Sequence, residues 1–414
     1  MGCKILLSTT VSWTSTARHA AGFALAGAEV VALAPKHAPV AASRYVAASY
    51  VHRPILGLAS LRQAIDRSAP DLIVPCDDRA VGNLLKLHAD EPAKASVSGL
   101  IERSLGRPER YSQVMSRTAS LAIARGLGIR VPETYPVASE EALEHCLDIL
   151  GPPVVLKVDG SWGGEGVVVA KTRTEARAAF AKLASPPSRI RSLGRAVRRR
   201  DSHHLLTALT PRRGRVSIQR FVHGRPAASA FACWQGEIRA AIYYDVLVAD
   251  GAIGPPSIIR RIDNCEMAEA TQRLAHHFGL SGLHGLDFIR EANGTAHLIE
   301  INPRATQGGT LPFGPGRDLA AALCGCVMSG AAARDPIASD TVVFFPRQWL
   351  RDPAGECLRE GHHDVPWDDP AILRASLQSL PPIAKFAGRK QFARVVPVAS
   401  RPRSAPLPEP AAGS

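Results

Sequence analysis

The stretch GLDFIREANGTAHLIEINPRATQGG, residues 285–309, decides the fold of this chain. A first apolar run is followed by turn residues at 292–294 and by a second apolar run from 296 to 301. Two apolar runs joined by a short turn predict a β-hairpin. On the returning strand Glu300 and Asn302 are two residues apart, so they point to the same face of the hairpin.

The predicted hairpin carries three oxygen-bearing side chains, Asp287, Glu300 and Asn302. Carboxylates within apolar strands are costly to bury unless a basic partner or a cation compensates their charge. Mg²⁺ takes one or two protein carboxylates together with water and substrate phosphates, so this set fits magnesium, with Mn²⁺ as a second option. Arg304 follows closely, where its guanidinium could grip an anion. The alternative is an exposed hairpin with polar residues on its wet face.

A second hairpin is predicted at 154–170, where two valine-rich runs flank a glycine-rich loop. Glycines let backbone N–H groups approach anionic oxygens closely. Lys157 stands in the first of these runs, and a lysine in an apolar strand favours a fixed anion such as phosphate. No GK[ST] follows, so the loop is not a Walker A motif. A simple tight hairpin is the alternative.

The beginning of the chain predicts a parallel sheet covered by helices. Strands are expected at 4–8, 29–34 and 69–76, with helices at 12–27 and from about residue 58. Small polar residues follow the strand ends, where open α/β sheets bind ligands, although helix capping explains them equally well. These residues are Thr9, Thr10, Ser12, Asp77 and Asp78.

Later segments predict further helices and strands by their apolar periodicity and turn residues. Helices are expected at 112–126, 266–278, 318–328 and 370–379. Strands are expected at 216–222, at 231–234 and 238–244 as a hairpin around Gln235 and Gly236, and at 341–350.

The run IEINPR at 299–304, with a DF strand before it and a glycine-rich turn after it, resembles the metal-binding end of the ATP-grasp superfamily. That superfamily includes D-alanine:D-alanine ligase, biotin carboxylase and carbamoyl phosphate synthetase. The helix containing Arg117, the loop GSWGGEG at 160–166 and the strand from 216 to 222 resemble further parts of the same fold. The likeness covers roughly residues 1 to 335.

The resemblance implies a role for each matching residue. Asp287, Glu300 and Asn302 would hold the magnesium ions that bridge the ATP phosphates, and Arg304 would contact the reacting phosphoryl or carboxylate group. Nucleotide-binding roles would fall to Arg117, Lys157, Ser161, Trp162, Gly163, Gly164, Gly166, Gln219, Phe221 and Val222. The expected catalytic pair is Arg304 and Lys157. Relatives often carry acidic residues at the positions of Gln219 and, for the ribose, near Pro226, so this chain departs from them there.

The implied fold is α/β, an ATP-grasp fold with an N-terminal parallel-sheet domain and two α+β subdomains that enclose the nucleotide. The expected boundaries place this first domain at 1–105, the ATP-grasp domain at 106–335 and an extension at 336–380. Within the ATP-grasp domain, the glycine-loop subdomain covers about 150–222 and a basic insertion about 186–215. The tail 381–414 is rich in Pro, Ala and Arg, a composition that favours disorder.

The net charge of +13 is concentrated in two segments. Residues 186–215 carry nine arginines and one aspartate, and residues 383–414 carry six basic residues and one glutamate. The arginine-rich insertion is consistent with a solvated segment, a docking surface for an anionic substrate or a nucleic-acid contact. It lacks interleaved aromatic residues, so nucleic acid is disfavoured as a partner.

The chain of 414 residues is 46% hydrophobic, which suits a protein of two or three packed units. Its eight cysteines form no CxxC pair, so they are interpreted as core residues. Neither a signal peptide nor a membrane-spanning run is evident. We therefore expect a cytoplasmic location.

The sequence thus predicts a ligase that uses ATP to activate a carboxylate as an acyl phosphate for attack by an amine or another nucleophile. Small-molecule carboxylates and nucleophiles are the expected partners, and a homodimer is compatible with this expectation. One alternative is carboxyphosphate chemistry like that of biotin carboxylase. Another is a non-catalytic nucleotide-binding protein that docks an acidic partner.

Overall fold

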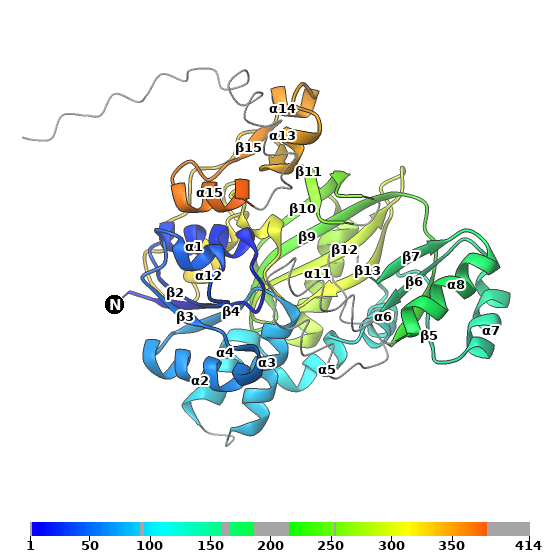
Figure 1. The fold of residues 1–414 in the computed structure, drawn as a ribbon, viewed down its shortest axis with the longest axis horizontal. Coiled ribbons are helices and arrows are strands. Elements are labelled where there is room, and N and C mark those ends of the chain that lie inside the picture. The colour runs from blue at the N-terminus through cyan, green and yellow to red at the C-terminus, as the bar shows by residue number, and fades with distance from the viewer. Residues whose placement is uncertain (1, 92–94, 159–165, 186–214, 252–253, 379–414) are drawn as a thin grey trace, which may run out of the picture.

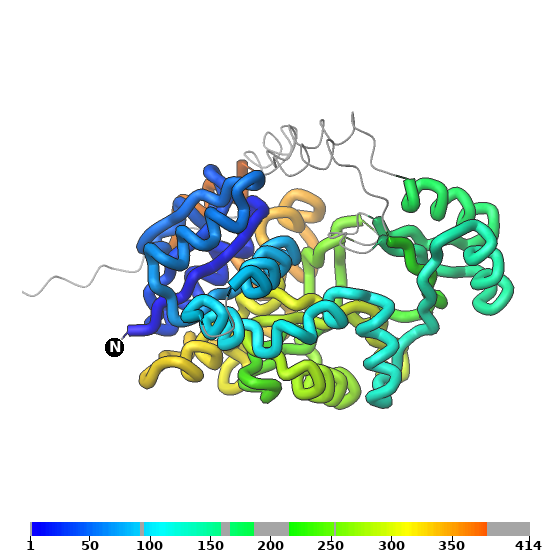
Figure 2. Tube along the Cα trace, turned by 90° about the horizontal axis from the view of Figure 1, so that it is seen from below, coloured from blue at the N-terminus to red at the C-terminus, as the bar shows by residue number. Residues whose placement is uncertain are grey.

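Three β-sheets organise the chain in the computed structural model, which describes residues 2–91, 95–158, 166–185, 215–251 and 254–378. The N-terminal sheet and a small antiparallel sheet lie at opposite ends of the molecule, and a large sheet lies between them (Figures 1 and 2). This arrangement of mixed α/β layers agrees with the predicted fold class. No helix among the described residues is long and apolar enough to cross a bilayer.

The N-terminal sheet is entirely parallel, with strand order β3-β2-β1-β4. Its strands are β1 (Lys4–Ser8), β2 (Glu29–Ala34), β3 (Ala48–Val51) and β4 (Leu72–Pro75). The helices that follow or connect them are α1 (Thr14–Leu25), α2 (Gly57–Ser68), α3 (Asp78–Asp90) and α4 (Ser96–Leu105). Nearly continuous apolar runs form β1, β2 and β4 because a parallel sheet is buried on both faces. No strand is predicted from the sequence at β3, because this edge strand is mostly exposed and carries little apolar signal.

The small sheet has strand order β5-β8-β6-β7 and is antiparallel throughout. Its strands are β5 (Thr134–Val137), β6 (Val154–Val158), β7 (Val167–Ala170) and β8 (Val216–Arg220). Helices α7 (Glu140–Leu150) and α8 (Arg173–Ala184) pack against it and close an apolar core of its own. The strand predicted at 216–222 is two residues too long, because β8 ends at Arg220.

The large sheet has strand order β13-β12-β9-β10-β11-β14-β15. Its strands are β9 (Arg225–Trp234), β10 (Glu237–Ala249), β11 (Pro256–Ile262), β12 (Gly282–Arg290), β13 (Ala296–Asn302), β14 (Thr341–Phe344) and β15 (His362–Asp364). Along β9 to β12, alternate side chains enter two different apolar clusters, and both clusters continue into the N-terminal sheet. Helices α11 (Cys265–Phe278) and α12 (Leu319–Cys324) pack against this sheet.

Several predicted boundaries are wrong for local reasons. The helix expected at 112–126 is two helices, α5 (Tyr111–Val114) and α6 (Arg117–Gly126), because Ser116 is extended. The strand expected at 341–350 stops at Phe344, and Pro346 precedes helix α13 (Arg347–Arg351). The helix expected at 318–328 ends at Cys324, where Gly325 follows.

The end of the described chain packs on its beginning. The remaining elements are η1 (Pro39–Ala42), η2 (Pro54–Leu56), η3 (Pro108–Arg110), η4 (Gln307–Thr310), α14 (Glu356–Glu360) and α15 (Pro370–Gln378). Arg18 of α1 forms an ion pair with Asp364 of β15. The Ser43 hydroxyl donates to Asp369 at 2.6 Å just before α15. Beyond the predicted domain boundary at residue 335, β14 pairs with β11 of the large sheet. The boundary itself stays a prediction.

Candidate functional site

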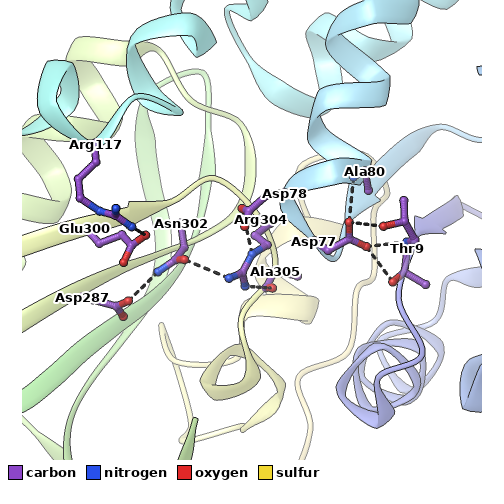
Figure 3. A network of polar contacts seen from close by, with 11 residues as sticks. Thr9, Asp77, Asp78, Ala80, Arg117, Asp287, Glu300, Asn302, Arg304 and Ala305 are labelled. Carbon is purple, nitrogen blue, oxygen red and sulfur yellow. Dashed lines mark hydrogen bonds and ion pairs between the residues drawn. The ribbon is translucent and has the colours of Figure 1, made fainter. Parts of the chain in front are cut away.

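The hairpin formed by β12 and β13 gathers the three predicted oxygen ligands at one end of the large sheet (Figure 3). Asp287 and Glu300 are direct cross-strand partners, and Asn302 pairs with Gly285 in the next position on the same face. The Asn302 amide donates to Asp287 at 3.0 Å. The predicted hairpin is therefore confirmed, and its polar side chains do not form a wet outer face, because Asp287 and Asn302 are largely enclosed.

The electrostatics of this hairpin favour a cation. Burial, together with the neighbouring charge of Glu300, raises the pKa of the Asp287 carboxyl to about 6. The hydrogen bond from Asn302 and the charges of Arg304 and Lys157 oppose that rise. Two carboxylates held together in a buried place repel each other, and a nearby positive charge relieves the repulsion.

Arg117 brings the first of these positive charges from the start of α6. Its Nη2 donates to Glu300 Oε1 at 2.6 Å, and its Nη1 donates to the Val158 carbonyl at 3.3 Å. Figure 3 shows the contact with Glu300. α6 begins at Arg117, directly after the extended Ser116. The guanidinium thus joins the end of β6 to the large sheet.

Lys157 brings a second positive charge from β6 and is only 4% exposed. Burial, together with the like charge of Arg117, lowers the pKa of Lys157 to about 8 against the opposing charges of Glu300 and Asp287. No carboxylate of the described residues forms an ion pair with Lys157. The lysine and the acidic hairpin, which are about 130 residues apart in sequence, therefore share one electrostatic site, as their predicted roles require.

Arg304 is held from two sides of the site. Its Nε donates to Asp78 Oδ1 at 3.1 Å and its Nη2 to Asn302 Oδ1 at 3.1 Å. The guanidinium also lies 5.8 Å from the centre of the Trp13 ring. Burial raises the pKa of Asp78 in spite of the charge of Arg304. No sequence pattern links Asp78 with Arg304; the one signal in the sequence is that Asp78 stands just after the strand that becomes β4.

Asp77 behaves differently from its neighbour Asp78. Its carboxylate accepts from the Thr9 hydroxyl at 3.0 Å, from the Thr10 N–H at 2.6 Å and from the Ala80 N–H at 3.0 Å. The last of these contacts caps α3. The capping interpretation is therefore confirmed for Asp77, and Figure 3 shows that the two aspartates serve separate networks.

The predicted nucleotide-binding residues are only partly within the described chain. Gly166 is described; its positive φ of 97° lets its carbonyl accept from Val158 N at 2.9 Å and close the β6–β7 pair. Outside the described residues lie Ser161, Trp162, Gly163 and Gly164, together with most of the basic insertion and the tail from 381 onward.

The predicted adenine-binding residues lie at the end of β8. Gln219 is buried, and its amide donates to the Thr134 hydroxyl at 2.9 Å across the sheet. Phe221 and Val222 follow the strand and are partly exposed, and the Phe221 ring meets His223 edge to face. The side chain of Gln219 is thus already bonded within the sheet, while Phe221 and Val222 remain available for a ligand. Their nucleotide roles stay predictions.

No protein-family model matches the sequence, and no curated protein matches it. Solved structures do match. N5-carboxyaminoimidazole synthetase from Staphylococcus aureus, complexed with ADP, is 13% identical with a TM-score of 0.55, covering 82% of this chain and 80% of that one. N5-carboxyaminoimidazole ribonucleotide synthetase from Thermus thermophilus is 16% identical with a TM-score of 0.55, covering 80% and 81%.

A third match is the biotin carboxylase domain of Hydrogenobacter thermophilus 2-oxoglutarate carboxylase, in complex with MgADP, ADP and bicarbonate. It is 13% identical with a TM-score of 0.57, covering 78% of this chain and 69% of that chain. The TM-scores establish a shared fold, and identities this low establish the fold alone. The predicted ATP-grasp fold is confirmed.

Proposed function

We propose that this chain is an ATP-dependent ligase that activates a substrate carboxylate as an acyl phosphate, which an amine or another nucleophile then attacks. The observation that supports it most is the meeting of Arg117 and Lys157 with the carboxylates of Asp287 and Glu300. Cations that bind phosphate and oxygens that bind a metal are the two halves of a phosphoryl-transfer site. The matched structures with bound ADP share this fold.

The residues present fit a magnesium ion. Among the described residues no group of three or more His, Cys, Asp or Glu side chains could hold a metal, but magnesium needs only one or two carboxylates beside phosphates and water. The carboxylates of Asp287 and Glu300 and the side-chain carbonyl oxygen of Asn302 would hold the magnesium ion. When bound, the ion supplies positive charge that stabilises the transferring phosphoryl group.

The chain's own residues bind and orient the reactants in this proposal. Lys157 and Arg117 neutralise phosphate charge. An oxygen of the acid attacks the γ-phosphorus, an O–P bond forms, and ADP leaves with the electron pair of the broken bond. The nucleophile then adds to the acyl carbon and displaces inorganic phosphate. This chemistry depends on positioning and charge and requires no protein nucleophile.

Arg304 has a narrower role here than sequence analysis expected. Its three nitrogens already donate within the protein, to Asp78, Asn302 and the Ala305 carbonyl. A guanidinium has five N–H donors, so two are left for an anion. We therefore assign Arg304 to hold the Asn302 amide in place and to offer its remaining donors to the acid.

The test is ADP release from Mg-ATP measured against a panel of amino acids, small carboxylic acids and amines. ADP release that requires one acid and one nucleophile, with stoichiometric phosphate, supports the ligase. Bicarbonate is included because one matched structure holds it, and bicarbonate-stimulated hydrolysis would instead support carboxyphosphate chemistry. Binding of Mg-ATP without ADP release under any condition would contradict both reactions and leave a nucleotide-binding protein.

A further inference from the structure

A single row of side chains crosses the large sheet from the candidate metal ligands to a tyrosine. Glu300 on β13 pairs with Asp287 on β12, Asp287 pairs with Ala228 on β9, and Ala228 pairs with Tyr244 on β10. Directly paired residues of neighbouring antiparallel strands lie on the same face. Tyr244 therefore lies on the carboxylate face, separated from Asp287 only by the methyl group of Ala228.

The ring of Tyr244 is fixed in this position by the backbone after β13. A Cβ on Gly308 would lie 2.5 Å from Tyr244 Cε1 and 2.7 Å from its hydroxyl oxygen. The phenol thus occupies the space into which a side chain at position 308 would project. Tyr244 is 4% exposed, so the ring is held by packing and its hydroxyl has little freedom to move away.

Two hydroxyls of this region have no hydrogen-bond partner among the described residues. The Thr306 Oγ1 is buried without a partner, and none of the described side chains or carbonyls bonds to the Tyr244 hydroxyl. Thr306 lies directly over Gly285, since a Cβ added to Gly285 would be 2.6 Å from Thr306 Cγ2. Burying the Thr306 hydroxyl without a partner is costly, and the Tyr244 hydroxyl has a donor that no described residue uses. Both observations favour a bound molecule that accepts hydrogen bonds.

We propose that the Tyr244 hydroxyl contacts the acid substrate, donating a hydrogen bond to one of its oxygens on the side of Asp287 that is remote from Glu300. This inference rests on the proposed ligase function and adds a residue that no motif indicated. Ala228 forms the floor of this subsite, and Thr306 lies beside it. Burial and the charge of Asp287 raise the pKa of Tyr244, so the hydroxyl keeps its proton and acts as a donor.

The neighbouring Tyr243 provides a matched control. It lies on the opposite face of β10, where it packs against the apolar cluster that includes α11. Tyr244→Phe and Tyr243→Phe each remove one oxygen atom and keep the ring. One change therefore removes the proposed donor, and the other removes a hydroxyl on the far face of the sheet.

The experiment compares these variants with the wild type in steady-state ADP release and in calorimetric binding, with the best acid of the panel titrated into protein holding Mg-ADP. A hydrogen bond to a charged oxygen predicts that Tyr244→Phe lowers kcat/KM for the acid roughly 10- to 100-fold and weakens acid binding. Mg-ATP affinity should stay unchanged. Tyr243→Phe should leave acid binding and kcat/KM at the wild-type level.

The possible outcomes separate the two proposals. Wild-type kinetics and acid affinity in Tyr244→Phe, with an active wild type, would overturn the role of Tyr244 and leave the ligase intact. Equal losses of Mg-ATP and acid affinity would indicate general disruption and would also overturn it. A wild type that releases no ADP with any acid would overturn both.

Discussion

Two antiparallel hairpins contribute to the candidate site, and they differ in how their charged groups are held. On the β12–β13 hairpin, Asp287 bonds to Asn302, which bonds to Arg304, which in turn pairs with Asp78 of the N-terminal sheet. On the β6–β7 hairpin, Lys157 is buried and none of the described carboxylates pairs with it. The oxygen-bearing hairpin is already organised by hydrogen bonds, whereas the lysine-bearing hairpin leaves its buried cation without a carboxylate partner among the described residues, as the proposed anion-binding role requires.

Removing a charge from the organised hairpin should have the largest effect. Glu300→Gln keeps the shape of the side chain but removes a proposed metal-binding carboxylate and the partner of Arg117. We expect acid-dependent ADP release to fall by about 1,000-fold, with Mg²⁺ dependence weakened and thermal unfolding nearly unchanged. The control is Glu291→Gln on the same hairpin, where the carboxylate pairs with His297 at 2.9 Å. Undiminished turnover in Glu300→Gln would remove the metal site from the proposal.

Removing the charge of the other hairpin should weaken nucleotide binding rather than folding. Lys157→Met deletes a buried cation, so we expect kcat/KM for Mg-ATP to fall about 100-fold while stability is unchanged or increased. Equilibrium binding of Mg-ADP and thermal unfolding measure the two effects separately. Lys171→Met, at an exposed position just after β7, is the matched control. Loss of stability without loss of affinity would show that Lys157 is structural.

The two neighbouring aspartates should separate function from folding. Asp78→Asn weakens the anchor of Arg304, and we expect kcat/KM for the acid to fall about 10-fold with little change in stability. Asp77→Asn disturbs the cap of α3 and the contacts with Thr9 and Thr10, so we expect a loss of about 1–2 kcal/mol in the free energy of unfolding and retained turnover. Steady-state kinetics and urea unfolding of both variants measure the loss of activity and the loss of stability separately. The reverse pattern would exchange the roles assigned to them.

The pH dependence of Lys157 should give the smallest effect. The pKa of Lys157 is lowered from 10.5 to about 8 by burial, so between these values the unfolded chain binds more protons than the folded one. Its contribution to the free energy of unfolding therefore increases with pH across that window, while Mg-ADP affinity should decrease above about pH 8 as the charge is lost. Lys157→Met should remove both slopes in a comparison of binding and unfolding at several pH values. Slopes that persist in the variant would assign them to other groups.

The sequence predicts the local parts of this site better than their partners. The β12–β13 hairpin follows from its own apolar periodicity, and the place of Asp287, Glu300 and Asn302 follows from strand alternation. The pairing of Arg304 with Asp78 depends on two segments 226 residues apart, and no periodicity links them. Tyr244 escaped notice because its position depends on the order of three neighbouring strands. The division between α5 and α6 was missed because Ser116 carries no strong breaking signal.

The apolar clusters show which of the three sheets share a core. Two clusters run continuously from the N-terminal sheet into the large sheet, whereas the third draws only on residues from Val137 to Ile218. The small sheet therefore has an apolar core separate from the two clusters that join the other sheets. Arg117 bonds both to Val158, at the end of β6 in the small sheet, and to Glu300 of the large sheet. A substitution at Arg117 would therefore alter the contact between two separately packed parts of the chain as well as the charge of the proposed site.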